Sequence, residues 1–413
     1  MVGYLTMAAK LVLNVHDLNN EGSVGQSLDI RQIRMVDELG NPLPEMPAVS
    51  GRMMKHWHLE HMLKDELNQT SSKLCPQCRV AEPERKPQDE NNGVKSCVIC
   101  DAHGFLCTDK PGFKATVDLS GTDVVLIKEA KDNGEEEHLV VIPCSHSTTD
   151  TNCPTCALRN LKGKKAKVTG ELFEEDDEEY IKVSYILSGT GKSKIEKGVS
   201  PKGLSLRRSS CVNFSWLLPV LNQDKDGKLL QPAAKQVIHS RVASGAEEGE
   251  DGTSQMIFYK SYASGVYAFV CSVDLGRIGK PLKGEVVADS AELNRRQKLA
   301  VQALLPICLG AFGASQSHAL PHAKCLSLLA AISTTEKPLP NLISPIYPTG
   351  MADSITLLNS MGEGVRWWTY GVGSGIEGKC GSIFNVFDAI ISAIGVETQA
   401  QSENGRGEGE AKP

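Results

Sequence analysis

Hydrophobic and polar positions alternate along several stretches of the chain, as they do in half-buried β-strands. The clearest stretch is Lys10 to His16, where Val12 is the one apolar residue on the polar side. Its apolar side is formed by Leu11, Leu13 and Val15, and its polar side by Lys10, Asn14 and His16. Three further stretches are predicted to be strands: Tyr180 to Leu187, Val212 to Val220 and Met256 to Val273.

A helical period replaces this alternation after Ser50, which is a good N-cap, and Pro47 disfavours helix before it. At about 100° per residue, the apolar side chains fall on one sector: Met53, Met54, Trp57, Leu63 and Leu67. A second sector is basic and contains Arg52, Lys55 and His58. Another long helix is predicted to begin near Asp289 and to run toward Gly310.

Strands and helices are thus mixed without a regular strand–helix–strand rhythm, so the sequence predicts an α+β fold. Asp17 to Gly25 is predicted to be a surface loop, because its residues tolerate turn conformations. The tail from Gln401 to Pro413 is predicted to be disordered.

The predicted helix start at Ser50 is also a place where an anion can bind. The first turn of a helix presents unpaired N–H groups and the positive end of the helix dipole. Arg52, Lys55 and His56 add cations there, and a phosphate suits such a site. A solvated basic helix face is the simpler alternative for any single cation. The order His58-Leu-Glu-His61 does not match the His-Glu-x-x-His of zinc proteases, which argues against that class.

Cysteine spacing gives the strongest chemical signal in the sequence. Two Cys-x-x-Cys pairs follow the first predicted helix, and such pairs turn four thiolates onto one tetrahedral zinc ion. Their members are Cys75, Cys78, Cys97 and Cys100. A second cluster consists of Cys144, His146, Cys153 and Cys156. The second cluster either completes its own site, or Cys153 and Cys156 close on Cys75 and Cys78. Because four protein ligands leave no open position, structural zinc at one or two sites is predicted.

Composition places the chain among globular proteins, with 413 residues of which 40% are hydrophobic. The net charge is −6, but acidic runs at Glu135 to Glu137, Glu174 to Glu179 and Gly245 to Gly252 account for it. The rest of the chain is net basic, so a nucleic-acid partner is not excluded. The longest nearly apolar run, Ala300 to Ala314, is too short for a membrane span. Without a signal-peptide layout, a cytoplasmic protein with no membrane partner is expected.

Familiar catalytic motifs are missing from the sequence. Ser188 to Ser193 looks like a phosphate-binding Walker loop, but the first glycine of that motif falls on Ile186. What remains is a flexible basic segment with Lys192, Lys194, Arg207 and Arg208, which suits a nucleic-acid backbone or a solvated loop equally. Asp101 and His103 form a possible acid–base pair without a nucleophile, so a turn beside the metal site is preferred.

The chain resembles the CRISPR-associated DevR autoregulator family, the backbone subunit of type I-A Cascade. The resemblance is spread over most of the chain and rests on the order and spacing of these segments: Leu11 to Gly25, Met46 to His61, Cys97 to Leu106, Arg207 to Pro219, Met256 to Ile278 and Gly310 to Pro321. It implies a modified RRM-like (ferredoxin-like) palm with inserted subdomains. It also implies a protein that binds CRISPR guide RNA, presents it to target DNA, stacks head-to-tail with further copies and other Cascade subunits, and does not cut.

On this resemblance the palm occupies residues 1–70 and 256–400. Residues 71–160 are expected to be a cysteine-rich zinc-binding insertion, residues 161–255 a basic and acidic segment that includes a thumb-like element, and residues 401–413 the tail. The resemblance implies RNA-backbone contacts at Asn19, Asn20, Ser23, Ser50, Gly51, Arg52, Lys55 and His56. Lys192, Lys194, Arg207 and Arg208 are added from the thumb-like segment.

Two other function classes stay open at this point. A zinc-dependent nucleic-acid-processing enzyme requires an open coordination position near a general base such as Asp101 or His103. A zinc-stabilised transcriptional regulator requires specific binding to duplex DNA by a symmetric dimer.

Overall fold

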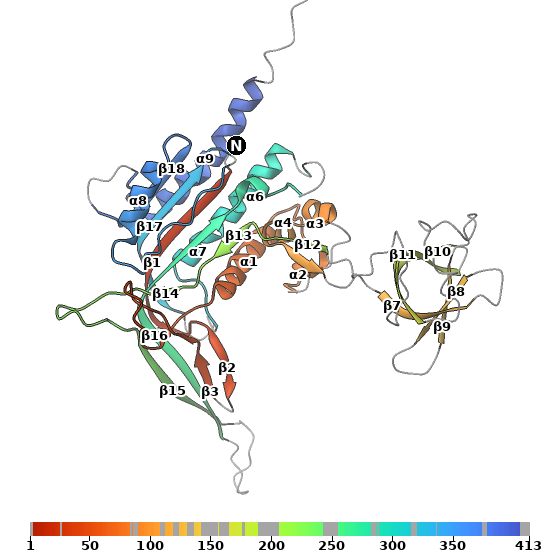
Figure 1. Cartoon of the computed structure of the whole chain (residues 1–413), viewed down its shortest axis with the longest axis horizontal. Helices are drawn as coiled ribbons and strands as arrows, with labels where there is room; N and C mark the ends of the chain where they lie inside the picture. The colour runs from red at the N-terminus through yellow and green to blue at the C-terminus, as the bar shows by residue number, and fades with distance from the viewer. Residues whose placement is uncertain are drawn as a thin grey trace, which may run out of the picture. The chain divides into compact units, whose positions relative to one another are not determined.

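A computed structural model gives the structure of the chain (Figure 1). It describes residues 3–24, 27–82, 85, 90–107, 112–118, 124–129, 136–141, 156, 165–175, 178–188, 206–242, 255–281, 286, 289–314, 320–335, 337–373 and 378–404. By their contacts the residues divide into two compact units. The first comprises Met1–Pro83, Gln88–Gly104 and Ser209–Pro413, and the second comprises Glu84–Pro87 and Phe105–Arg208. The predicted segment boundaries at 70, 160, 255 and 400 were assigned from composition and resemblance, and they stay a prediction.

The first unit is organised around β1 (Tyr4–His16), which lies in the sheet between β16 (Gln255–Val273) and β17 (His322–Ser333). Both pairings are antiparallel, so that Met7 lies opposite Cys271 on one side and Ala330 on the other. Within the described residues the sheet has nine strands in the order β18-β17-β1-β16-β3-β2, and β13, β14 and β15 also pair with β16. Helices with a largely antiparallel sheet confirm the mixed fold class.

The remaining strands of this sheet are shorter, apart from β15. They are β2 (Asn20–Val24), β3 (Ser27–Ile30), β13 (Val212–Phe214), β14 (Leu218–Pro219), β15 (Ala233–Val242) and β18 (Val365–Tyr370). β4 (Gln32–Ile33) and β5 (Met46–Pro47) form a separate pair. The expected loop at 17–25 is therefore wrong in part, because Asn20–Val24 pairs with Ser27–Ile30. The strand predicted from Val212 to Val220 forms as two short pieces.

The centre of the sheet is buried on both faces, which explains why the start of β1 is apolar apart from the buried Thr6. Leu5, Met7, Ala8 and Ala9 are fully buried. Ala8 belongs to a core cluster with Leu329 and with side chains of α8 (Gly350–Ser360). A strand that is covered on both faces does not alternate between apolar and polar residues. The alternating pattern therefore identified only the part of β1 after Ala9.

The end of β1 differs from the predicted alternation. The register shifts between Leu13 and His16, where Val15 has a φ of 54° and is 47% exposed. His16 is 1% exposed, although it was assigned to the polar side. An irregularity of this kind moves the next side chains to the opposite face. The assignments of Val15 and His16 were therefore wrong.

The first predicted helix is α1 (Gly51–Leu67), and it begins where the N-cap predicted. Met54, Met62 and Leu63 are buried along it. His58 is also fully buried, and Leu67 is 44% exposed. The basic sector thus contains Arg52 and Lys55 but not His58, whose ring nitrogens find partners inside the protein, as described below.

The second predicted helix begins as expected, because Asp289 caps α6 (Ser290–Gln302) by accepting from the Glu292 N–H at 2.8 Å. It does not run unbroken to Gly310, because α7 (Leu304–Cys308) follows as a separate helix. Pro306 lacks an N–H and its ring collides with the carbonyl of Gln302, which explains the break. The other helical elements of this unit are α2 (Pro76–Arg79), α3 (Glu90–Ser96), α4 (Val98–His103), η1 (Leu275–Arg277) and α9 (Ile383–Asn404).

The second unit contains a closed five-stranded barrel in the order β10-β11-β9-β8-β7. Its strands are β7 (Gly112–Asp118), β8 (Val124–Glu129), β9 (Glu136–Val141), β10 (Lys165–Glu175) and β11 (Glu178–Ser188). β11 contains the strand predicted from Tyr180 to Leu187. β6 (Phe105–Cys107) and β12 (Leu206–Arg208) pair where the chain enters and leaves this unit.

The prediction of a disordered tail from Gln401 is wrong for its first four residues, which are helical. α9 runs past Gln401 to Asn404, and residues 405–413 of the predicted tail lie outside the described residues. Across the described residues, no helix combines the length and apolar character needed to cross a bilayer.

Candidate nucleic-acid interface and metal site

The start of α1 is held by a residue far away in sequence. Asn19, which follows β1, accepts hydrogen bonds at Oδ1 from the Ser50 backbone N–H (3.2 Å) and from the Ser50 hydroxyl (2.9 Å). The Ser50 oxygen in turn accepts from the Met53 N–H at 3.3 Å, which completes the N-cap. Asn19 and Ser50 are both buried. The structure therefore brings together two residues that the sequence assigned to one site.

Gly51 has a packing reason to be glycine. A Cβ built there lies 2.6 Å from the carbonyl oxygen of Phe214 and 3.0 Å from that of Ser215. These are backbone atoms, so they can move away from a side chain at position 51 only if the β13–β14 segment itself shifts. The first turn of α1 consequently lies directly against the β13–β14 segment.

A groove of about 940 Å³ opens at this helix start. It is lined by Asn19, Arg31, Ser50, Gly51, Arg52, Met53, His56, Phe214 and Trp216. Five of the predicted RNA contacts lie in this lining. Arg31, Phe214 and Trp216 were missed, because they come from segments distant from α1 in sequence. Nothing in their local pattern distinguishes them from ordinary surface or core residues.

The other predicted contacts do not line this groove. Lys55 is half-buried on α1, and Asn20 and Ser23 lie in β2. Lys192 and Lys194 lie outside the described residues. Arg207 is exposed in β12, whereas Arg208 is 3% exposed. Burial removes Arg208 from the set of surface cations, so of this pair only Arg207 can reach a phosphate.

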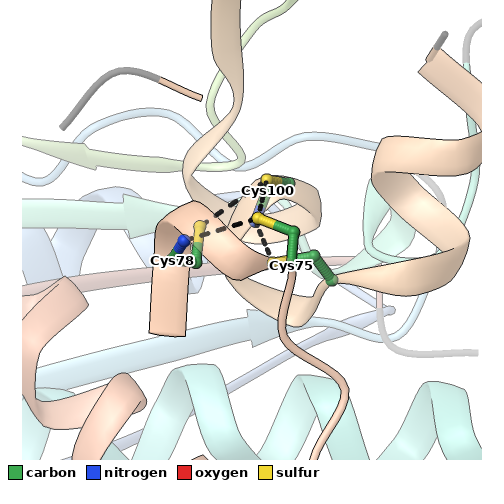
Figure 2. Close-up of side chains that lie close together, drawn as sticks. Cys75, Cys78 and Cys100 are labelled. Carbon is green, nitrogen blue, oxygen red and sulfur yellow. Dashed lines mark hydrogen bonds between the residues drawn. The ribbon is translucent and has the colours of Figure 1, made fainter. Parts of the chain in front are cut away.

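Cys75, Cys78, Cys97 and Cys100 form one cluster, in which the four sulfur atoms lie within 4.8 Å of one another. Each Cys-x-x-Cys begins a short helix, because the first sulfur accepts from the N–H of the last residue at 3.4 Å. Figure 2 shows Cys75 and Cys78 directed toward Cys100, with sulfur separations of 3.8 and 3.7 Å. Zinc–sulfur bonds of about 2.3 Å place the corners of a tetrahedron about 3.8 Å apart. The cluster therefore fits zinc and favours the pairing of Cys75 and Cys78 with Cys97 and Cys100. The alternative closure on Cys153 and Cys156 stays untested, because Cys153 lies outside the described residues.

The electrostatics of the cluster agree with a bound cation. Hydrogen bonds from the Cys100 and Cys75 thiols lower the pKa of Cys97. The pKa of Cys75 is raised by its bond to Cys97 and by burial, and that of Cys100 by its bonds to Cys78 and Cys97. The Cys97 thiol thus loses its proton more readily than the thiols of Cys75 and Cys100. A dication removes this difference, because it stabilises all the thiolates together.

The second predicted metal cluster stays a prediction. Cys144, His146 and Cys153 lie outside the described residues, and Cys156 is buried. Cys211, Cys271, Cys308 and Cys325 are buried, and Cys380 is partly exposed.

Asp101 belongs to a buried ion-pair network rather than to an acid–base pair. Its Oδ2 accepts from the Arg296 guanidinium at 2.9 Å and from the Gly279 N–H at 2.7 Å. Arg296 also donates to Glu292 at 2.7 Å. Burial alone raises the pKa of Glu292, but hydrogen bonds from Arg295 and Arg296 bring it down to about 2. The network joins α4, which carries Cys100, to α6.

His103 contacts another buried histidine. Its Nε2 lies 2.9 Å from His58 Nδ1, and His58 Nε2 lies 2.8 Å from the Ala300 carbonyl oxygen. A carbonyl only accepts, so His58 carries its proton on Nε2, and His103 therefore donates from Nε2 to His58. Burial lowers the pKa of His58 to about 4, which keeps the ring neutral near pH 7. Asp101 and His103 are both committed to structural partners.

The fold and the site define a mixed α/β protein with a largely antiparallel sheet, a groove with arginines at a helix start and a cluster of four cysteines that could hold a metal ion. The chain belongs to the family described as "CRISPR-associated negative auto-regulator DevR/Csa2", whose model matches residues 7–118 and 185–353. Residues 119–184, which include β8, β9 and β10, lie between the two matched segments.

Three relatives illustrate the range of similarity. A "CRISPR-associated protein Cas7/Cst2/DevR" of Thermoproteus tenax is 38% identical over 38% of this chain and 48% of its own length. A protein with the same description from Methanocaldococcus jannaschii is 23% identical over 83% of this chain and 85% of its own. A "CRISPR-associated aCascade subunit Cas7/Csa2 2" of Saccharolobus solfataricus is 31% identical over 31% of this chain and 39% of its own. This chain therefore spans about half or less of the length of the Thermoproteus and Saccharolobus relatives.

Solved structures show only a distant likeness. A chain from a "CRISPR RNA-guided surveillance complex" gives a TM-score of 0.43 at 9% identity, covering 94% of this chain and 99% of its own. A chain from a "CRISPR RNA-guided surveillance complex, pre-nicking" gives a TM-score of 0.44 at 12% identity, covering 95% of this chain and 100% of its own.

Proposed function

We propose that this chain is a CRISPR guide-RNA-binding backbone subunit of a type I-A Cascade complex and is not itself a nuclease. Membership of the DevR family supports the proposal, and so does the Saccharolobus relative, which is described as an aCascade subunit. Its partners on this proposal are guide RNA, target DNA paired to that guide, further copies of the chain arranged head-to-tail, and other Cascade subunits.

The strand order supports an RRM-like palm. Along the chain the elements follow the order β1, α1, the β13–β15 strands, β16, α6 and β17. In the sheet, β1 lies between β17 and β16, and β16 also pairs with β13, β14 and β15. Strand–helix–strand–strand–helix–strand with the first strand between the third and the fourth is the ferredoxin-like arrangement. The zinc site and the second unit are then additions to this palm.

The observation that carries the proposal is the groove at the start of α1. Arg52 supplies a cation, His56 supplies an imidazole that can hydrogen-bond, and the first turn of a helix supplies N–H groups. A protein that holds many different guides must grip phosphates and sugars and leave the base edges free for pairing. The Lys192 to Arg208 segment is our proposed thumb-like element.

The first test is to express the chain together with a CRISPR array and ask whether it copurifies with protected RNA of regular length. Recovery of an RNA-free monomer, even with guide RNA supplied, contradicts the proposal. Intact RNA after prolonged incubation with the zinc-loaded protein supports a non-catalytic role, whereas cleavage supports the processing-enzyme alternative. The buried partners of Asp101 and His103 favour intact RNA.

The second test addresses the start of α1, where Arg52 lines the groove and Lys55 follows it one turn later on the same helix. Arg52→Ala with Lys55→Ala is expected to weaken RNA binding without sequence preference and to flatten its salt dependence. Arg34→Ala with Lys64→Ala removes the same charge at exposed positions outside the lining. If both double variants behave alike, the groove is not the site of backbone contact.

A further inference from the structure

The lining of the groove at the start of α1 includes two aromatic residues, Phe214 and Trp216, and of these only Trp216 is an exposed residue. Trp216 is 38% exposed and lines the groove. Phe214 also contributes to the lining, but its ring packs inward, with its centroid 6.0 Å from that of Phe269 and 5.8 Å from that of His58. An exposed tryptophan in a concave site is a large apolar surface left open to solvent. Trp216 is therefore the aromatic surface available to a ligand.

A guanidinium lies over this tryptophan. The Arg31 Cζ is 5.9 Å from the Trp216 ring centroid, within the range of cation–π attraction. The Arg31 backbone is held on both sides, because its N–H donates to the Asn19 carbonyl at 2.7 Å and its carbonyl accepts from the Ala48 N–H at 3.0 Å. The same Asn19 caps α1 through Ser50. Hydrogen bonds through Asn19 and Ser50 thus connect the Arg31 backbone to the start of α1, which carries Arg52.

The backbone around Trp216 is equally well fixed. Leu217 and Val49 exchange two hydrogen bonds, at 2.9 and 3.1 Å. Ser215 donates from its N–H to the Val270 carbonyl at 2.8 Å. A preorganised side chain loses little conformational freedom when a ligand binds. The pair Arg31 and Trp216 therefore forms a wall with a defined position beside the helix start.

The charge of the lining indicates what this wall receives. Among the described residues that line the groove, Arg31 and Arg52 are cationic and none is a carboxylate. An anion that also carries a flat ring matches both features. A nucleotide within a single strand is such a ligand, because its base offers a π-face and its two flanking phosphates carry charge. In a duplex the bases are already stacked on one another.

We propose that Trp216 is a stacking surface for one base of a bound single-stranded RNA, with Arg31 and Arg52 placed at the neighbouring phosphates. This rests on the proposed function, and it adds contact with a base to a site so far described by its backbone contacts. Contact with the face of a base is indifferent to sequence, since every base has one.

The test compares full-length variants on three synthetic RNAs: a single strand, the same strand with its bases removed, and the corresponding duplex. Trp216→Ala is expected to lose about tenfold in affinity for the single strand, whereas Trp216→Phe keeps most of it. The matched control is Trp368→Ala. Trp368 also has an arginine over its ring, Arg366 at 5.3 Å, but it lies in β18 and does not line the groove.

The result that supports the inference is a loss confined to Trp216→Ala and to RNA that carries bases, so that wild type and variant bind the base-free strand equally. Equal affinity of Trp216→Ala and Trp368→Ala for the single strand overturns it. An equal loss on the base-free strand also overturns it. If Arg52→Ala with Lys55→Ala still weakens RNA binding while Trp216→Ala does not, only the stacking inference fails. If the wild-type chain binds none of the three RNAs, the proposed function fails first.

Discussion

The side-chain oxygen of Asn19 accepts hydrogen bonds from both the N–H and the hydroxyl of Ser50, although 31 positions separate the two residues. Asn19→Ala leaves a buried N–H without its acceptor, so we expect it to lower the free energy of unfolding by about 1–3 kcal/mol. Ser50→Ala should cost about 1 kcal/mol through loss of the N-cap. Urea unfolding of both single variants and the double variant measures the coupling between them. Strictly additive losses contradict a shared network.

Gly51→Ala is expected to destabilise the protein by several kcal/mol and to weaken RNA binding. Its new Cβ meets the Phe214 carbonyl oxygen at 2.6 Å, so either α1 or the β13–β14 segment must move. Gly381→Ala is the control, because a Cβ there meets only the Asn385 side chain at 3.8 Å. Thermal unfolding and RNA titration of the two variants should separate clearly. Equal melting temperatures would refute the close approach.

Asp101→Asn should lower stability by on the order of 3 kcal/mol, because it removes one partner from a buried ion pair with Arg296. Arg34→Ala breaks an exposed pair with Glu45, whose side chains are 80% and 53% exposed, and should change stability little. The comparison also bears on catalysis. If Asp101→Asn keeps its stability but abolishes an RNA-processing activity, Asp101 is a catalytic residue after all.

Acid should destabilise the protein through two buried histidines. Burial lowers the pKa of His58 and of His16 to about 4, from 6.5 for the exposed group. Between these values the unfolded chain binds protons that the folded chain does not, so stability falls as the pH drops through 6.5 toward 4. From pH 7.5 to 5.0 each histidine should account for roughly 2 kcal/mol. Urea unfolding at both pH values checks this.

The variant for this test is His58→Asn, which removes one of these two histidines while His61, whose pKa burial also lowers, stays in place. Its loss of stability between the two pH values should be smaller than that of the wild type by the share of one histidine. His16→Asn should behave in the same way. An unchanged loss in both variants shows that other groups dominate the acid response.

Binding of zinc at the four-cysteine cluster should be detectable both as zinc content per chain and as a higher melting temperature. Cys78→Ser is expected to remove one zinc per chain and to lower the melting temperature strongly, because structural zinc supplies folding free energy. Cys380→Ser, a free cysteine outside the cluster, should do neither. Metal analysis of the wild type also counts the sites, since a second zinc that persists in Cys78→Ser indicates that the downstream cluster binds one as well. No zinc in the wild type contradicts the site.

The sequence predicted features that depend on neighbouring residues. The Ser50 cap, the Asp289 cap and the two Cys-x-x-Cys pairs are local signals, and each forms where it was expected. The Val15 irregularity and the burial of His58 were not predicted, because they depend on partners in β16 and α6. The groove shows the same limit. Arg52 and His56 were found from the helix pattern, whereas Arg31 and Trp216 reach it only through tertiary folding.

The pairing of β6 with β12 has a consequence for the segment between them. Phe105 lies opposite Arg208, so the first and last residues of the long excursion through the barrel are neighbours in a two-stranded ladder. For the rest of the protein, the segment from Phe105 to Arg208 is therefore a long loop whose two ends are adjacent. The entropy cost of closing such a loop grows only slowly with its length. A change in the length of the barrel segment therefore leaves the strand pairings of the first unit in place.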